Sequence, residues 1–114
     1  MISKFKKTLF LFAHPDDETL GAGGTISLLR RKNKDVYVGL SSSGINSRNN
    51  LLSSRKINQD LMKLKNNCFD ALKCLGVKKN KVIFGNFPDN ENDTVPLLQL
   101  TQWVESLINK IKPD

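Results

Sequence analysis

Short apolar runs alternate with amphipathic stretches along this chain of 114 residues. Residues 8–13 and 36–42 are apolar on both faces, which is typical of central strands in a parallel sheet. Residues 24–32 lie between these runs and are expected to be helical. The first half of the chain therefore predicts a right-handed β-α-β unit whose two strands lie side by side.

The clearest helical pattern lies in the second half of the chain. Apolar residues recur there at steps of three and four, so that they form one face of a long helix, which Gly76 ends as a left-handed cap. Cys68 belongs to this face and is expected to be a small core residue. The full set is Ile57, Leu61, Leu64, Cys68, Leu72 and Leu75.

A third strand and a last helix follow the long helix. Residues 81–84 predict the short strand, and Pro96 marks the first turn of the helix. Trp103 lies near the apolar face of this last helix and is expected to pack rather than to bind a ligand. That face holds Leu97, Leu100, Val104, Leu107 and Ile111.

Strands that alternate with helices indicate an α/β fold, here a three-layer Rossmann-like fold with a mostly parallel sheet. Residues 44–52 and 87–95 are rich in Asn, Ser and Asp without periodicity, so we interpret them as loops. Each of them follows a strand. Because open α/β sheets bind ligands at the carboxyl ends of their strands, both loops are expected on one rim with the residues that follow the first strand.

The first strand runs directly into the string AHPDDE at residues 13–18. The only histidine of the chain, His14, is kept at the strand end because Pro15 disfavours helical geometry in the residue before it. His14 and Asp17 are close enough in sequence to bind one zinc ion at roughly 2.0–2.2 Å. Asp16 would then lie outside the coordination shell, where a carboxylate can accept a proton from water that the metal has acidified. The string predicts metal-assisted hydrolysis.

A structural explanation competes with the metal site. Acidic residues cluster at helix N-termini, where they cap backbone N–H groups and complement the helix dipole. Asp17 and Glu18 alone would favour this explanation, because a helix is expected to begin near Leu20. The histidine and proline upstream, together with the string GAGG at residues 21–24, favour the metal site.

The longer string AHPDDETLGAGGT, at residues 13–25, resembles the N-terminal signature of the PIG-L or LmbE-like zinc deacetylases. The resemblance implies that His14 and Asp17 bind a Zn²⁺ cofactor and that Asp16 is the general base. It further implies an enzyme that removes the N-acetyl group from an N-acetylglucosamine-type amino sugar or glycoconjugate, a small-molecule substrate.

The same resemblance implies that the metal site is incomplete in these residues. The family completes its site with a second histidine after a later strand, so a third protein ligand, a His, is expected beyond residue 114. Residues 1–114 would then be a single LmbE-like deacetylase domain truncated at its C-terminal end, and inactive alone. The outer edge of residues 8–13 would lack a partner strand. Because such an edge invites pairing with another chain, a homo-oligomer stays open.

Weaker similarities to the family continue along the chain. Residues 41–44 end the second strand where the family has a Ser- or Thr-containing turn that lines the site, and Gly44 belongs to this turn. Asp89 lies in a segment that resembles a loop whose aspartate can hydrogen-bond substrate hydroxyls. Gly44 and Asp89 are therefore candidate substrate-binding residues. Residues 63–67 depart from the family, which generally has Arg followed closely by Glu there.

The net charge of +7 raises the question of a nucleic-acid partner. The basic residues form separate groups at residues 4–7, 30–34, 63–65 and 78–81, without an interleaved aromatic platform or a recognised motif. We therefore predict a solvated surface and no nucleic-acid partner.

No apolar run approaches the roughly 18 residues that span a bilayer. Residues 1–7 lack the apolar core of a signal peptide. A cytoplasmic protein without a membrane span is expected.

Two other function classes stay open. A nucleotide-binding module could use the strand-to-helix turn at residues 21–24, although the carboxylates just before it would repel phosphate. A non-catalytic fragment of the same fold that binds a sugar or another protein is the second alternative.

Overall fold

The computed structural model describes residues 4–14, 17–42, 54–87 and 97–114. These residues form three strands and three α-helices that alternate, which confirms the predicted α/β fold. A 3₁₀ turn, Lys79–Lys81, directly precedes the last strand. The elements are β1 (Lys7–Phe12), α1 (Asp17–Arg31), β2 (Asp35–Ser42), α2 (Ser54–Cys74), β3 (Val82–Phe87) and α3 (Leu97–Ile111).

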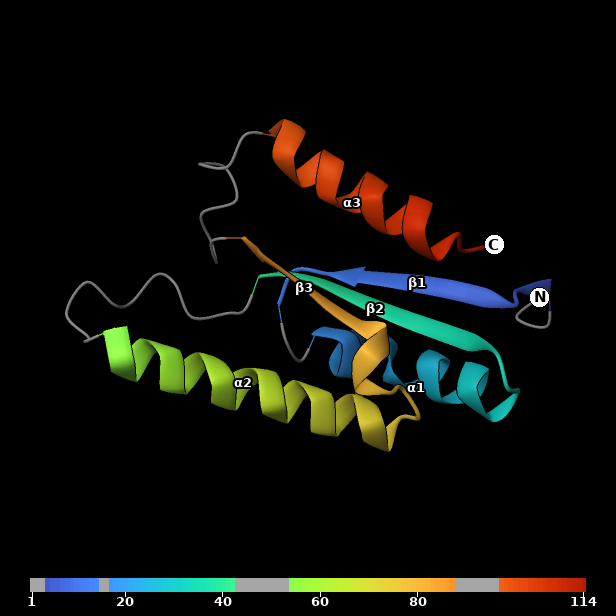
Figure 1. The fold of residues 1–114 in the computed structure, drawn as a ribbon. Coiled ribbons are helices and arrows are strands. Elements are labelled where there is room, and N and C mark those ends of the chain that lie inside the picture. Colours follow the sequence, from blue (N-terminus) through green and yellow to red (C-terminus); the bar gives the residue numbers. More distant parts are fainter. Residues whose placement is uncertain (1–3, 15–16, 43–53, 88–96) are drawn as a thin grey trace.

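The sheet is parallel throughout and its strand order is β1-β2-β3. Lys7 pairs with Asp35 at the start of β1, and Val82 at the start of β3 pairs with Val38. The second strand therefore lies beside the first, as predicted, and β1 is an edge strand of the described sheet. Figure 1 shows α1 and α2 on one face of the sheet and α3 on the other, so the structure has three layers.

The main core lies between the sheet and the helices α1 and α2. Alternate residues of β2 point into it, and Val36, Val38 and Leu40 are completely buried. Cys68 is 1% exposed, which confirms its predicted place in the core. The helices contribute Ile26, Leu29, Cys68 and Leu72.

The face under α3 depends on glycine. A Cβ atom at Gly85 would lie 2.9 Å from Cε2 of Trp103, and one at Gly39 would lie 3.1 Å from Cδ1 of Leu107. The two glycines thus let α3 approach the sheet, and the indole packs edge-on against Phe87 with ring centroids 5.7 Å apart. The prediction that Trp103 packs agrees with this arrangement.

Leu97 was expected on the apolar face of the last helix, and this prediction is wrong. Its exposed fraction is 77%, whereas Leu107 and Ile111 on the same helix are buried. Leu97 is the first residue of α3 and precedes Trp103 by about 9 Å along the helix axis. The described strand residues do not cover the helix at that point.

Several element boundaries differ from the predicted ones. Helix α1 begins at Asp17, three residues before the start expected near Leu20 and well before residue 24, and the burial of Gly23 and Ile26 outweighs the low helix propensity of glycine. Strand β3 continues to Phe87 past a register shift opposite residues 40–42, where Asn86 has φ +59°. The cap at Gly76 is confirmed by its φ of +94°.

Candidate functional site

Hydrogen bonds join the carboxyl end of β1 to β2 directly before His14. The carbonyl oxygen of Ala13 accepts a hydrogen bond from the backbone N–H of Ser42 at 2.9 Å and another from the Ser41 hydroxyl at 3.3 Å. His14 itself is half-buried. The backbone that carries the imidazole is therefore held at the carboxyl edge of the sheet.

The two serines are the polar residues of the described core. Ser41 is 9% exposed and Ser42 is completely buried. The Ser41 side chain has a specific role, since it binds the carbonyl before His14. Sequence reasoning placed these serines at the strand end but did not assign Ser41 this contact. The signal was a run of hydroxyl residues directly after an apolar strand.

Helix α1 begins only a few residues after the end of β1. Asp17 is its first residue, at the helix terminus where the dipole favours a carboxylate. The start of the helix is packed against the strand end, because a Cβ at Gly21 would lie 3.8 Å from Cε1 of Phe12. The turn between β1 and α1 is thus anchored on both sides.

The sheet register relates the remaining candidates to His14. Ser42, which binds the Ala13 carbonyl, also pairs with Phe87 at the end of β3. Gly44 follows Ser42 by two residues, and Asp89 follows Phe87 by two. Strand β2 therefore ends beside the strand end that precedes His14, and β3 ends one strand further away.

Of the predicted site residues, the structure describes His14 and the backbone of Asp17. Asp16, Gly44 and Asp89 lie outside the described residues. Within the described part of the chain, no group of three or more His, Cys, Asp and Glu residues could hold a metal ion.

The chemistry of the donors suits zinc, because an imidazole nitrogen and a carboxylate oxygen are both common zinc ligands. His14 and Asp17 come from the two anchored sides of one turn. Six acidic residues occur in the sequence shortly after β1 and β3. They are Asp16, Asp17, Glu18, Asp89, Glu91 and Asp93.

Among the helices that the structure describes, none combines the length and the apolar character required to cross a bilayer. Cys68 and Cys74 are not joined by a disulfide bond, and Cys74 is exposed.

The fold is similar to that of a solved enzyme, the N,N'-diacetylchitobiose deacetylase from Pyrococcus horikoshii in complex with its inhibitor MPG. The TM-score is 0.82 at 25% sequence identity, and the match covers 99% of this chain. The chain spans 40% of the length of that deacetylase. Comparison with curated proteins gave no match.

The family comparison agrees with the resemblance found in residues 13–25. The model of the PIG-L family, described as GlcNAc-PI de-N-acetylase, matches residues 9–114. The match takes in most of β1, the turn with the candidate metal ligands and every element that follows. The chain therefore belongs to the PIG-L family.

Proposed function

We propose that this protein acts as a zinc-dependent deacetylase that hydrolyses the N-acetyl group of an N-acetylglucosamine-type amino sugar or glycoconjugate. The family match over residues 9–114 and the likeness to a chitobiose deacetylase support the reaction and the substrate class. The observation that carries the proposal is the turn at the carboxyl end of β1, where an anchored strand end bearing His14 leads into a helix that begins at Asp17.

In this proposal His14 and Asp17 are two protein ligands of the zinc ion. The resemblance to the family implies a histidine as the third ligand, and because residues 1–114 hold no second histidine, this ligand is proposed to lie outside them. When bound, zinc polarises the acetyl carbonyl and lowers the pKa of water at the site. The hydrogen bonds of Ser41 and Ser42 to Ala13 hold the backbone before His14 and so orient the imidazole.

Asp16 is the proposed general base. Its carboxylate accepts a proton from the attacking water while the water oxygen adds to the amide carbon, and the same group can return the proton to the leaving amine. Gly44 and Asp89 are proposed to contact the sugar, Asp89 by accepting hydrogen bonds from hydroxyl groups. The products are acetate and a free amino sugar.

The decisive experiment measures zinc content and acetate release, with N-acetylglucosamine and N,N'-diacetylchitobiose as substrates. Residues 1–114 are compared with a version extended by the coding sequence downstream of residue 114. We expect one tightly bound zinc ion and acetate release only from the extended version. Zinc binding without acetate release from either sugar would indicate a binding protein rather than an enzyme. Absence of zinc from both versions would overturn the metal site.

A further inference from the structure

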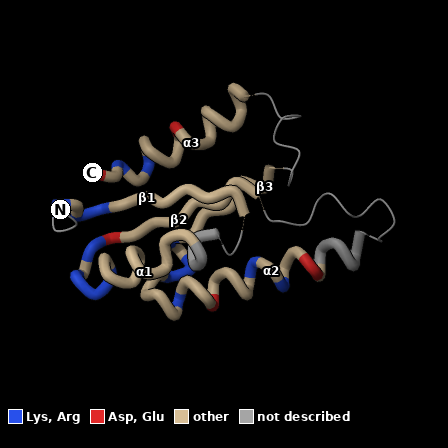
Figure 2. The backbone as a smooth tube through the Cα atoms, turned by 180° about the vertical axis from the view of Figure 1, so that it is seen from behind, with Lys and Arg blue, Asp and Glu red and all other residues tan. Residues whose placement is uncertain are grey.

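Most of the eighteen Lys and Arg residues of the chain lie at one end of the sheet. The segments that enter β1, β2 and β3, and the end of α3, meet at the amino ends of the parallel strands. Figure 2 shows the basic positions of these segments gathered near the two chain ends and the end of α1. We call this set the basic pole. It comprises Lys4, Lys6, Lys7, Arg30, Arg31, Lys32, Lys34, Lys73, Lys78, Lys79, Lys81, Lys110 and Lys112.

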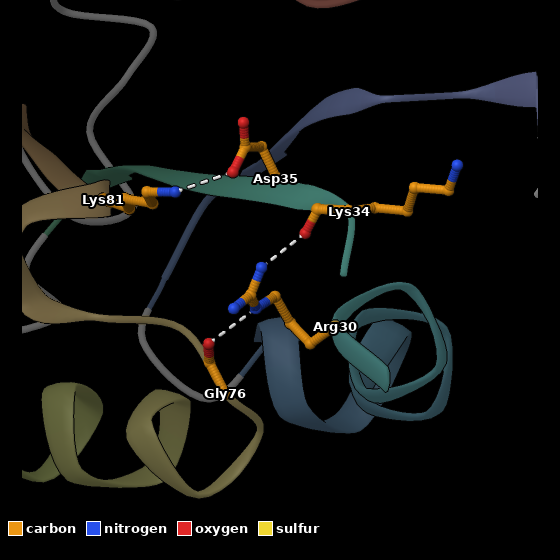
Figure 3. Close-up of polar contacts among 5 residues, drawn as sticks. All are labelled: Arg30, Lys34, Asp35, Gly76 and Lys81. Atoms are coloured by element: carbon orange, nitrogen blue, oxygen red, sulfur yellow. Dashed lines mark hydrogen bonds and ion pairs between the residues drawn. The ribbon is translucent and has the colours of Figure 1, made fainter. Parts of the chain in front are cut away.

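Specific contacts hold these segments against one another (Figure 3). The Arg30 guanidinium donates from Nε to the Gly76 carbonyl at 2.8 Å and from Nη1 to the Lys34 carbonyl at 2.6 Å. Lys81 Nζ lies 3.0 Å from Asp35 Oδ1 and so ties the start of β3 to that of β2. The basic pole is therefore a defined surface rather than a set of loose tails.

A further pair of contacts joins the two ends of the chain to the basic pole. The backbone N–H of Asp114 donates to the Lys7 carbonyl at 2.9 Å, and the Asp114 carboxylate accepts from the Lys6 N–H at 2.8 Å. The connecting segments and helix ends that form this pole carry three acidic residues, which are Asp35, Asp70 and Asp114. The cations outnumber them several-fold, so the surface carries a large positive charge.

Stabilisation of helix ends explains only part of this charge. Cations in the last turn of a helix are favoured by the dipole, and this accounts for Arg30, Arg31, Lys73 and Lys110. Lys4 and Lys6 precede β1 instead, and Lys7 is its first residue. Such a concentration of positive charge increases the repulsion within the folded state, which a partner of opposite charge would relieve.

The aromatic residues at this pole distinguish between two kinds of anionic partner. Single-stranded nucleic acids require open aromatic faces on which bases stack. Here the ring of Tyr37 lies under Lys81 Nζ at 5.2 Å and that of Phe69 under Lys79 Nζ at 4.9 Å. Phe5, in contrast, is 42% exposed and is flanked by Lys4 and Lys6. An exposed apolar side chain among lysines is suited to the interface of an anionic bilayer.

We propose that the basic pole binds the surface of an anionic lipid bilayer, with its cations on the lipid head groups and Phe5 at the boundary with the acyl chains. The protein would lie on the membrane without crossing it. The carboxyl ends of the strands then face away from the lipid. If the proposed deacetylase function holds, its site opens to the aqueous side and takes a soluble amino sugar rather than a bilayer lipid.

The test is cosedimentation with vesicles of phosphatidylcholine alone and of phosphatidylcholine mixed with phosphatidylglycerol. We expect binding only to the anionic vesicles, with loss of binding as salt rises well above about 0.1 M. The variant Lys4→Gln, Lys32→Gln, Lys78→Gln should bind roughly 100-fold more weakly, since each lysine near the surface contributes on the order of 5-fold. All three side chains are exposed, so the fold should be unaffected.

A charge-matched control replaces Arg55, Lys56 and Lys63 by Gln, in the half of α2 that is remote from the basic pole. This control variant should retain most of the vesicle binding. Phe5→Ala should weaken binding roughly 10-fold, whereas Met62→Ala, which removes another exposed apolar side chain, should not. Equal losses in both triple variants would show a nonspecific charge effect and overturn the proposal.

A mobility-shift assay with duplex and single-stranded oligonucleotides provides the competing outcome. Binding to oligonucleotides at a salt concentration where anionic vesicles are not bound would show that the partner of the basic pole is a nucleic acid and not a bilayer. Vesicle binding requires no catalysis. Its failure would therefore leave the proposed deacetylase function intact, and loss of acetate release would leave the vesicle result intact.

Discussion

The two ends of the sheet differ in the charge of the segments that they carry. The connections that enter the strands bear the lysines and arginines of the basic pole, whereas those that leave β1 and β3 bear six carboxylates, at residues 16–18, 89, 91 and 93. These two groups of connections belong to opposite edges of the sheet, because parallel strands place all their entering connections at one edge and all their leaving connections at the other. The same topology can therefore provide a cation site at one end and a surface for anions at the other.

The two ends also differ in how the structure holds them. At the amino end, charged side chains join the segments, as the contacts of Arg30 and the pair formed by Asp35 and Lys81 show. At the carboxyl end, the contacts before His14 are made to a backbone carbonyl, that of Ala13. Substitutions at the amino end should therefore affect stability and surface binding, and substitutions at the carboxyl end should affect chemistry.

The largest effect is expected for Asp16→Asn in the zinc-loaded extended protein. The change removes the proposed base without removing a ligand, so kcat should fall by about 10²- to 10⁴-fold while zinc stays bound. His14→Ala should lose both zinc and turnover. Acetate release and metal analysis measure the two properties. Asp70→Asn, an exposed carboxylate in the second half of α2, is the control. Undiminished turnover in Asp16→Asn would remove this residue from the mechanism.

Gly85→Ala tests whether the carboxyl end of the sheet depends for its stability and function on the packing between the sheet and α3. The new methyl group would lie 2.9 Å from both Trp103 and Phe87, so the unfolding free energy should fall by about 1–3 kcal/mol. Phe87 is the last residue of β3, and its displacement should also lower turnover. Denaturant unfolding measures the loss. Gly24→Ala is the matched control, because a Cβ there meets nothing within 4 Å.

Arg30→Ala should separate stability from catalysis. The variant loses two hydrogen bonds to backbone carbonyls at a partly buried site and should unfold more easily by about 1–2 kcal/mol. Turnover per folded molecule should not change, since Arg30 lies at the amino end. Arg31→Ala, the exposed neighbour, is the control for removal of one charge. A fall in turnover of folded Arg30→Ala would show that the two ends are coupled.

The smallest effect concerns Asp35 and its dependence on pH. The hydrogen bond and charge of Lys81 hold the pKa of Asp35 below its ordinary value of 3.8, and the charges of Lys7 and Arg30 act in the same direction. Asp35→Asn should therefore destabilise the protein by about 0.5 kcal/mol at pH 7, because half-exposed ion pairs contribute little.

The sign of this pH dependence follows from the lowered pKa. The ion pair stabilises the fold fully above the ordinary pKa and loses this effect as pH falls through the lower folded value. Unfolding curves of wild type and Asp35→Asn should differ at pH 7 and converge in acid below about pH 4. A difference that grows on acidification would contradict the contact between Asp35 and Lys81.

The comparison of prediction and structure shows which features depend on local sequence. The stripe that includes Cys68 and Leu72 predicted the buried face of α2, and Gly76 predicted its left-handed end, because both signals arise within one helix. The sequence pattern ends the third strand at residue 84, and only the ring of Trp103, eighteen residues after Gly85, accounts for a glycine inside β3. Leu97 fits the helical period of the apolar residues, but its side chain is largely exposed in the structure.

The sequence by itself determined the family and the predicted metal ligands. The string at residues 13–25 is contiguous, so the family resemblance and the predicted ligands His14 and Asp17 can be recognised in it without the rest of the chain. Only the tertiary structure decided that lysines from separate segments share one surface and that Ser41 fixes the backbone before His14. Those arrangements depend on the parallel register of β1, β2 and β3, which joins residues far apart in sequence and leaves no local signal.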